Sequence, residues 1–138
     1  MNHGARARSL AAIDRFAAAC ADHPLVVAAF LGGSYAAGTA RDDSDIDVYL
    51  VTREADYPLF VAERGPFMAS WGRVTWAEEV WDFEGLGFDM ICFRHEDGVH
   101  GEVALGHTAN FMQLHGGPHR TLVDEADLLD GVSFPLLQ

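Results

Sequence analysis

Residues 25–53 read LVVAAFLGGSYAAGTARDDSDIDVYLVTR and join a glycine-serine turn to a pair of aspartates. Residues 25–31 are apolar and partly β-branched, which predicts a strand buried on both faces. Gly32 and Gly33 follow this strand, where the chain must turn sharply. Ser34 is expected to cap a short helix, whose free N-terminal amides and dipole suit a phosphate group. The first half of the stretch therefore predicts a phosphate-binding turn.

The second half carries Asp45 and Asp47 in the next expected strand, with ten residues between the serine and the first aspartate. Because side chains alternate along a strand, both carboxylates share one face, and Ile46, Val48 and Leu50 point to the other. Two like charges at one place disfavour each other's ionisation, and a cation between them relieves the repulsion. Oxygen-only ligands at this spacing favour Mg²⁺ over zinc. The pair is therefore expected to bind a metal ion that bridges to triphosphate oxygens.

Together, Gly33-Ser34 and Asp45-x-Asp47 with a strand on each side resemble the motif of the nucleotidyltransferase superfamily, which shares a polymerase-β-like palm. The likeness is closest to small bacterial members that adenylylate antibiotics or proteins. It covers about a fifth of the chain, and its strand, turn, helix and strand in register make it more specific than a lone glycine motif. The resemblance implies an α/β (α+β) palm, with a mixed β-sheet flanked by helices. It also implies that Gly33 and Ser34 hold the nucleotide's phosphates and that Asp45 and Asp47 hold Mg²⁺.

A third acid is expected from a predicted β-hairpin over residues 88–105, in which Asp97-Gly98 forms the turn between two apolar arms. Sites of this class need a further carboxylate to complete the metal cage or to take a proton from the attacking hydroxyl. Glu102 is favoured, because its arm resembles the strand on which small antibiotic nucleotidyltransferases carry this acid. Asp89 is the alternative, because an acid between Phe88 and Met90 at a strand start needs a partner.

The flanking segments predict helices and one more strand. Residues 5–21 predict a helix that packs on the sheet. Its expected apolar stripe consists of Leu10, Ile13, Phe16 or Ala17, and Cys20. Residues 54–70 suggest a helix broken at the Gly-Pro pair of residues 65–66. Residues 74–83 predict a strand with Trp76 among its packing residues.

The C-terminal third predicts a short helix over residues 108–115, a turn at 116–118, a strand at 120–123 and an apolar tail from 128 to 137. His119 and Arg120 follow the turn and are expected within reach of a triphosphate. Four histidines stand in this part of the chain or just before it, but no pair of them has zinc-ligand spacing backed by Cys. We interpret them as solvated or loop residues: His100, His107, His115 and His119.

Length and composition predict one domain over residues 1–138, without the helical second domain that longer relatives carry. The absence of a long apolar run and of a signal-peptide core favours a cytoplasmic protein. Cys20 and Cys92 are interpreted as isolated thiols in apolar surroundings, as in a reducing compartment. Three organisations fit these features: a fragment, a homodimer with shared sites, or a minimal enzyme that acts on a partner protein.

The charge balance narrows the range of partners. Nine basic residues, all Arg, stand against 21 Asp and Glu for a net charge of -12. This balance opposes a nucleic-acid template, which needs clustered basic residues, and it attracts cationic acceptors such as aminosugars. The absence of Lys excludes a lysyl-adenylate or Schiff-base intermediate.

The sequence therefore predicts a Mg²⁺-dependent nucleotidyltransferase with Asp45, Asp47 and Glu102 as its catalytic acids. The expected reaction moves AMP from ATP to a hydroxyl of a small acceptor, such as an aminoglycoside-like or lincosamide-like compound. One alternative is a minimal nucleotidyltransferase antitoxin that adenylylates and neutralises a partner toxin. Another is a catalytically silent nucleotide-binding module.

Overall fold

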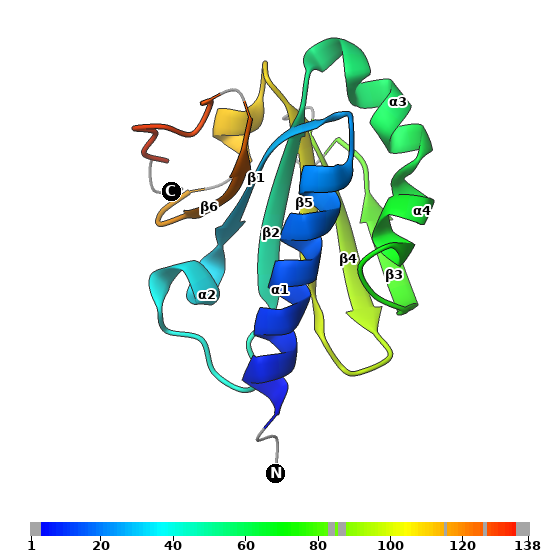
Figure 1. The fold of residues 1–138 in the computed structure, drawn as a ribbon, viewed down its shortest axis with the longest axis vertical. Helices are drawn as coiled ribbons and strands as arrows, with labels where there is room; N and C mark the ends of the chain where they lie inside the picture. Colours follow the sequence, from blue (N-terminus) through cyan, green and yellow to red (C-terminus); the bar gives the residue numbers. More distant parts are fainter. Residues whose placement is uncertain (1–3, 83–84, 86–87, 115, 126, 135–138) are drawn as a thin grey trace.

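The computed structural model describes residues 4–82, 85, 88–114, 116–125 and 127–134, and its centre is a six-stranded mixed sheet (Figure 1). The strand order is β3-β4-β5-β2-β1-β6. β2 and β5 run parallel, and every other neighbouring pair is antiparallel. The strands are β1 (Val26–Gly32), β2 (Ile46–Thr52), β3 (Val74–Val80), β4 (Asp89–His95), β5 (His100–His107) and β6 (Arg120–Asp124). The helices are α1 (Ala5–Asp22), α2 (Gly33–Ala37), α3 (Tyr57–Ala62) and α4 (Arg64–Ala69), with 3-10 turns η1 (Glu54–Asp56) and η3 (Phe111–Gln113).

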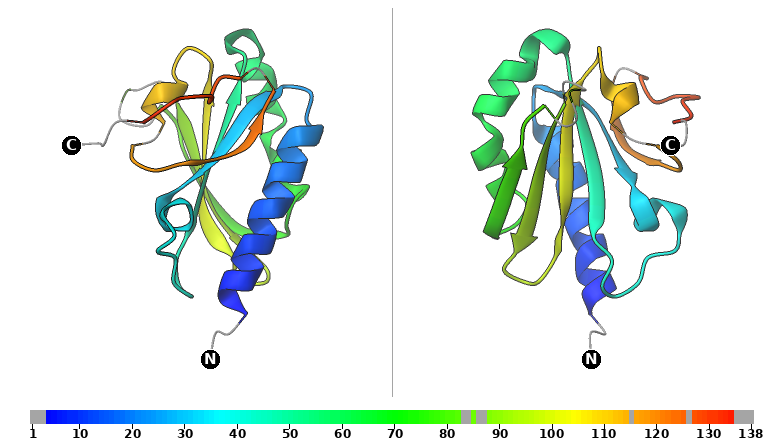
Figure 2. Two further views of the ribbon diagram at one scale, coloured as in Figure 1. Left: turned by 60° about the vertical axis from the view of Figure 1, so that its left-hand side comes forward. Right: turned by 180° about the vertical axis from the view of Figure 1, so that it is seen from behind.

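One face of the sheet is covered by α1, α3 and α4 and holds the larger core (Figures 1 and 2). Phe16 of α1 is fully buried there, with its ring edge-on to the rings of Phe67 and Trp71. The apolar residues of β2 face this core, as the alternation predicted: Ile46, Val48 and Leu50. The expectation for Leu10 was wrong, because its side chain is 47% exposed. The buried stripe of α1 passes through Ser9, Ala12, Ile13, Phe16 and Cys20, which leaves Leu10 beside it.

The opposite face is partly covered by the C-terminal segment. Phe30 of β1 stacks on Tyr49 of β2 at 4.6 Å between ring centroids and on Phe134 at 4.9 Å. Leu114 and Leu129 belong to the same cluster. This second core covers one end of the face, and the end where β2 begins lies outside it.

Several expected elements lie where the sequence placed them, and others shift. The hairpin of β4 and β5 and the strand β6 are confirmed. The helix over 54–70 breaks at Glu63, not at residues 65–66, because Pro66 lies in the first turn of α4, where a missing amide hydrogen costs little.

Two further expectations need correction. Trp76 is 51% exposed, because it projects from the edge strand β3 on the face opposite α1, α3 and α4, and Phe83 of the expected strand lies outside the described residues. The helix expected over 108–115 is only the turn η3, and His115 lies outside the described residues. The amide of Thr108 is bonded to the carbonyl of Thr52, which ties this backbone to β2.

None of the described helices has the length and apolar character needed to cross a membrane.

Candidate active site

The glycine-serine turn lies directly against one of the two aspartates. Gly33 has a φ of +61°, and a Cβ built on it would lie 2.1 Å from Oδ2 of Asp47. Only a residue without a side chain fits such a contact in this backbone conformation. Gly32 is the N-cap of α2 and Ser34 lies inside the helix without a capping hydrogen bond, so the expectation that Ser34 caps it was wrong.

The strand register brings a third carboxylate beside Asp47. Asp47 is paired with Gly32 on one side and, across the parallel β2–β5 ladder, with Glu102 on the other. Neighbours in a parallel ladder point the same way, and both side chains project from the face opposite α1. Asp45 immediately precedes β2, next to His100, and its Oδ1 lies 2.6 Å from Nε2 of that histidine.

The acids interact electrostatically. Burial, followed by the charges of Glu102 and Asp45, raises the pKa of Asp47 to about 6. Burial and the charge of Asp45 also raise the pKa of Glu102 above its usual range. Negative charge is therefore concentrated at one point of the open face, next to a turn of backbone amides, and a cation there would relieve the repulsion.

A family model described as nucleotidyltransferase domain matches residues 13–82, which is about half of the chain and includes the turn and both aspartates. The chain belongs to the nucleotidyltransferase family. The mixed sheet flanked by helices agrees with the nucleotidyltransferase palm, as the sequence predicted. A comparison with curated proteins returns no match. The matched range ends before β4 and β5, so it does not include Glu102, which stays a prediction from resemblance that its place beside Asp47 supports.

Nucleotidyltransferases generally use a nucleoside triphosphate and a divalent cation, and the donor set here is chemically suited to Mg²⁺. In the described parts of the chain, no three His, Cys, Asp or Glu side chains already form a group that could hold a metal ion. Mg²⁺ does not require such a cage, because proteins bind it through one or two carboxylates together with substrate phosphates and water. Asp45 and Asp47 supply carboxylates of this kind beside the Gly33 turn.

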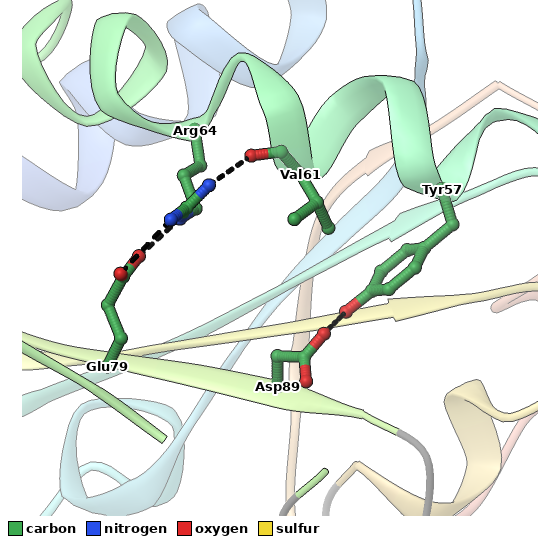
Figure 3. A network of polar contacts seen from close by, with 5 residues as sticks. All are labelled: Tyr57, Val61, Arg64, Glu79 and Asp89. Carbon is green, nitrogen blue, oxygen red and sulfur yellow. Dashed lines mark hydrogen bonds and ion pairs between the residues drawn. The ribbon is translucent and has the colours of Figure 1, made fainter. Parts of the chain in front are cut away.

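Asp89, the alternative third acid, lies on the other face of the sheet from Asp47. It alternates with Ile91 and Phe93, which belong to the core under the helices. Its Oδ2 accepts a hydrogen bond of 2.6 Å from the hydroxyl of Tyr57 in α3 (Figure 3). Asp89 therefore has the partner that its apolar setting requires, and this partner lies on the face opposite Asp47.

Sequence reasoning missed the surroundings of two residues near the acids. His100 was interpreted as a solvated or loop histidine, and its pairing with Asp45 was not foreseen. Cys92 was expected in apolar surroundings, but it is paired with Glu102 across the β4–β5 ladder. Burial raises the pKa of the Cys92 thiol, with further contributions from Glu102, Glu78 and Asp45. The hairpin register counted outward from Asp97-Gly98 would have revealed the pairing of Cys92 with Glu102, but not that of His100 with Asp45.

The remaining expected residues lie near the second core. The ring of His119 packs edge-on against Phe30 and Phe134, which indicates a packing role. Arg120 is exposed and is paired with Leu31 at the end of β1, close to the glycine turn. Cys20 is fully buried, as the sequence analysis expected.

Proposed function

We propose that this chain transfers a nucleoside monophosphate to a hydroxyl group, with ATP as the donor and AMP as the transferred group. The observation that supports this best is the contact of the Gly33 turn with Asp47, with Glu102 on the neighbouring strand. Phosphate-binding amides and carboxylates that bind cations are thereby adjacent. Nucleotidyl transfer needs both, because its barrier is lowered chiefly by positioning and by neutralising charge.

The residues would divide the work as follows. Gly33, Ser34 and the first amides of α2 bind the β- and γ-phosphates. Asp45 and Asp47 hold Mg²⁺, which neutralises charge on the triphosphate when bound. To bind Mg²⁺ with both carboxylate oxygens, Asp45 would have to give up the contact between its Oδ1 and His100.

Glu102 is the proposed general base. The acceptor oxygen attacks the α-phosphorus, its proton passes to Glu102, and the bond between the α-phosphorus and the bridging oxygen breaks to release pyrophosphate. The raised pKa of Glu102 favours this step, because a more basic carboxylate takes the proton more readily.

The proposed acceptor is a small hydroxyl compound, such as an aminoglycoside-like or lincosamide-like molecule. The net charge of -12 supports a cationic acceptor and opposes a nucleic-acid template. An antitoxin that adenylylates a partner toxin would use the same site. A silent nucleotide-binding module would use only the residues that bind the nucleotide. Localisation in the cytoplasm, where ATP and Mg²⁺ are plentiful, agrees with all three.

The test is incubation with Mg²⁺, each nucleotide labelled at the α-phosphate, and a panel of aminosugars, lincosamide-like compounds and cell protein. We expect label from ATP to move to a small molecule. Label in a single cell protein would favour the antitoxin, and nucleotide binding without transfer would favour the silent module. Binding of no nucleotide at all would contradict the family role.

The acids are tested by Asp47→Asn and Glu102→Gln, each of which removes a charge at nearly constant volume. We expect Asp47→Asn to abolish transfer and Glu102→Gln to reduce it by about 100-fold or more, in the range typical of a lost general base. Asp89→Asn is the matched control and should retain turnover, because Asp89 faces the helices. Full turnover in Asp47→Asn would overturn the metal assignment.

A further inference from the structure

Buried polar groups without a partner are concentrated at one place in the molecule. Among the described residues, four buried side-chain atoms have no hydrogen-bond partner: Oη of Tyr35, Nε1 of Trp71, and Nδ1 and Nε2 of His95. Three of these four atoms belong to Trp71 and His95, whose ring centroids lie 4.8 Å apart. Buried polar groups are nearly always hydrogen-bonded, and exceptions often mark a functional site. The place where these two rings meet is therefore a candidate site for a polar ligand.

His95 is the more informative of the two rings. It is 3% exposed and ends β4 on the face covered by helices, since it alternates with Ile91 and Phe93 of the larger core. Burial lowers the pKa of His95, so the ring is neutral at pH 7 and offers one N–H donor and one acceptor. Its contacts with the rings of Trp71 and Phe93 account for its burial, but they use neither of these polar groups.

A cleft of about 300 Å³ lies beside this ring, on the face of the sheet opposite the acids of the candidate active site. Its walls come from α1, from the segment before β3 and from the turn between β4 and β5: Arg15, Gly72, Arg73, His95, Glu96 and Asp97. A Cβ built on Gly72 would lie 2.5 Å from Nδ1 and 2.6 Å from Nε2 of His95. The unpartnered nitrogens therefore lie at the wall of the cleft that Gly72 forms.

Arg15 supplies further unused donors to the cleft. Its Nε donates a hydrogen bond of 2.8 Å to the carbonyl oxygen of Trp71, which holds the guanidinium close to the two rings. Among the described residues, the terminal nitrogens of Arg15 have no hydrogen-bonded or ion-paired partner. A guanidinium held in this way suits a carboxylate, which can accept two parallel hydrogen bonds from it. The N–H of His95 can add a third donor to the same carboxylate.

The turn between β4 and β5 gives the cleft two carboxylates. Glu96 contacts Arg73 at 3.7 Å, and because both side chains are exposed, this pair is weak and readily exchanged. Asp97 is held in place by a hydrogen bond from the amide of Val99. These carboxylates and the net charge of -12 disfavour a ligand that is an anion overall. A ligand with one negative group for Arg15 and one positive group for the turn matches the whole lining.

We infer that this cleft binds a small zwitterion of the α-amino-acid class, whose carboxylate pairs with Arg15 and His95 and whose ammonium group pairs with the carboxylates of the turn. A volume of about 300 Å³ is at the lower end of the range for small-molecule sites, which suits a ligand of this size. Opening of the loose contact between Arg73 and Glu96 admits the ligand to the ring nitrogens, which are shielded from solvent in the free protein. The inference does not depend on nucleotidyl transfer.

The first test measures binding to the metal-free protein, with each standard amino acid at about 10 mM, constant pH and constant ionic strength. We expect at least one of them to raise Tm by about 3 °C or more, as a dissociation constant of about 1 mM would do. Its N-acetyl derivative and its amide each lack one of the two charges and should have no effect. Equal binding of the N-acetyl derivative would overturn the zwitterion, and binding of no amino acid would overturn the site.

The second test compares Glu96→Gln with Glu63→Gln by calorimetry, using the amino acid that binds best. Glu63 is the matched control, because it is an exposed glutamate of the neighbouring cleft between α1 and α4, which also includes Arg15. Glu96→Gln should weaken binding about tenfold, through the loss of one charge-assisted contact. Glu63→Gln should leave it within twofold. Equal weakening in both variants would place the ligand in the neighbouring cleft and overturn the inference.

The third test observes the ring of His95 directly, by NMR of protein labelled with ¹³C at the histidine Cε1 positions. The resonance of His95 is recognised by its lowered pKa and by its loss in His95→Phe, which keeps the aromatic contacts and removes both nitrogens. We expect this resonance to shift when the amino acid binds, and His95→Phe to bind at least tenfold more weakly. A His95 resonance that does not move in the saturated parent protein would contradict the site, whether or not the variant folds.

Discussion

Gly33 illustrates at the scale of a single residue how backbone and side-chain geometry are coupled in this site. Its φ is +61° and a Cβ would strike Asp47, whereas Gly38 has a φ of +78° with nothing within 4 Å of its Cβ position. We expect Gly33→Ala and Gly38→Ala each to lose about 1 kcal/mol of unfolding free energy through backbone strain. Only Gly33→Ala should also reduce nucleotidyl transfer, by more than about tenfold, because it displaces the carboxylate. Urea denaturation and initial rates measure the two effects, and equal loss of activity in both variants would contradict the contact.

Asp47 makes the stability of the metal-free protein depend on pH. Its pKa is raised from 3.8 to about 6, so the folded protein holds this proton more tightly than the unfolded chain does. Stability due to Asp47 is therefore full below pH 4, falls as the pH rises through 6, and stays reduced above it. In EDTA at pH 7.5 we expect Asp47→Asn to be more stable than the parent by about 1 kcal/mol, after allowance for solvent screening. The difference should disappear near pH 4 in urea denaturation, and a destabilised variant at pH 7.5 would contradict the acid cluster.

What could be predicted at this scale depends on distance along the chain. The turn at Gly33 and the side of the strand on which Asp47 lies could be predicted from sequence, because turn chemistry and strand alternation are local rules. The pairing of His100 with Asp45 was not found, because it depends on the register between β2 and β5. Glu102 was identified by resemblance, and its position beside Asp47 follows from the same register.

At the scale of elements, the hydroxyl of Tyr57 joins α3 to the sheet through two acceptors, Oδ2 of Asp89 at the start of β4 and the carbonyl oxygen of Leu105 in β5. Burial, together with the hydrogen bond to Asp89, raises the pKa of the Tyr57 hydroxyl (Figure 3). We expect Tyr57→Phe to lower the unfolding free energy by about 1–2 kcal/mol, because a partly buried carboxylate loses this donor and keeps only the amide of Asp82. Transfer should remain within twofold of the parent, because this contact lies on the other face from Asp47. A loss of turnover in folded Tyr57→Phe would return Asp89 to the list of site acids.

The elements were predicted well where hydrophobic pattern and turn residues agreed. The hairpin around Asp97-Gly98 has both signals and is observed as β4 and β5. The break near Pro66 was misplaced because proline both ends helices and begins them, and only the packing of α4 distinguishes the two. Trp76 was expected among the packing residues of its strand, but an edge strand with one open face has no core on that side.

At the scale of the whole molecule, the net charge of -12 opposes compaction. Raising NaCl from about 20 to 200 mM shortens the screening length from about 20 to 7 Å and should stabilise the fold by about 1 kcal/mol, or about 3 °C in Tm. Choline chloride should match NaCl, because the effect is screening alone. MgCl₂ at equal ionic strength should exceed both if the acids bind the ion, and a Tm that falls with NaCl would contradict net self-repulsion.

The parallel pairing of β2 with β5 has a consequence for the newly synthesised chain. Asp47 on β2 and Glu102 on β5 are distant in the sequence. They become neighbours only when β5, which follows α3, α4, β3 and β4 in the chain, pairs with β2. An incomplete chain emerging from the ribosome already carries the glycine turn and both aspartates, yet lacks the strand that holds Glu102. If Glu102 is the base, as proposed, nucleotidyl transfer would begin only once the sheet is complete, and nascent or half-unfolded copies would be inactive.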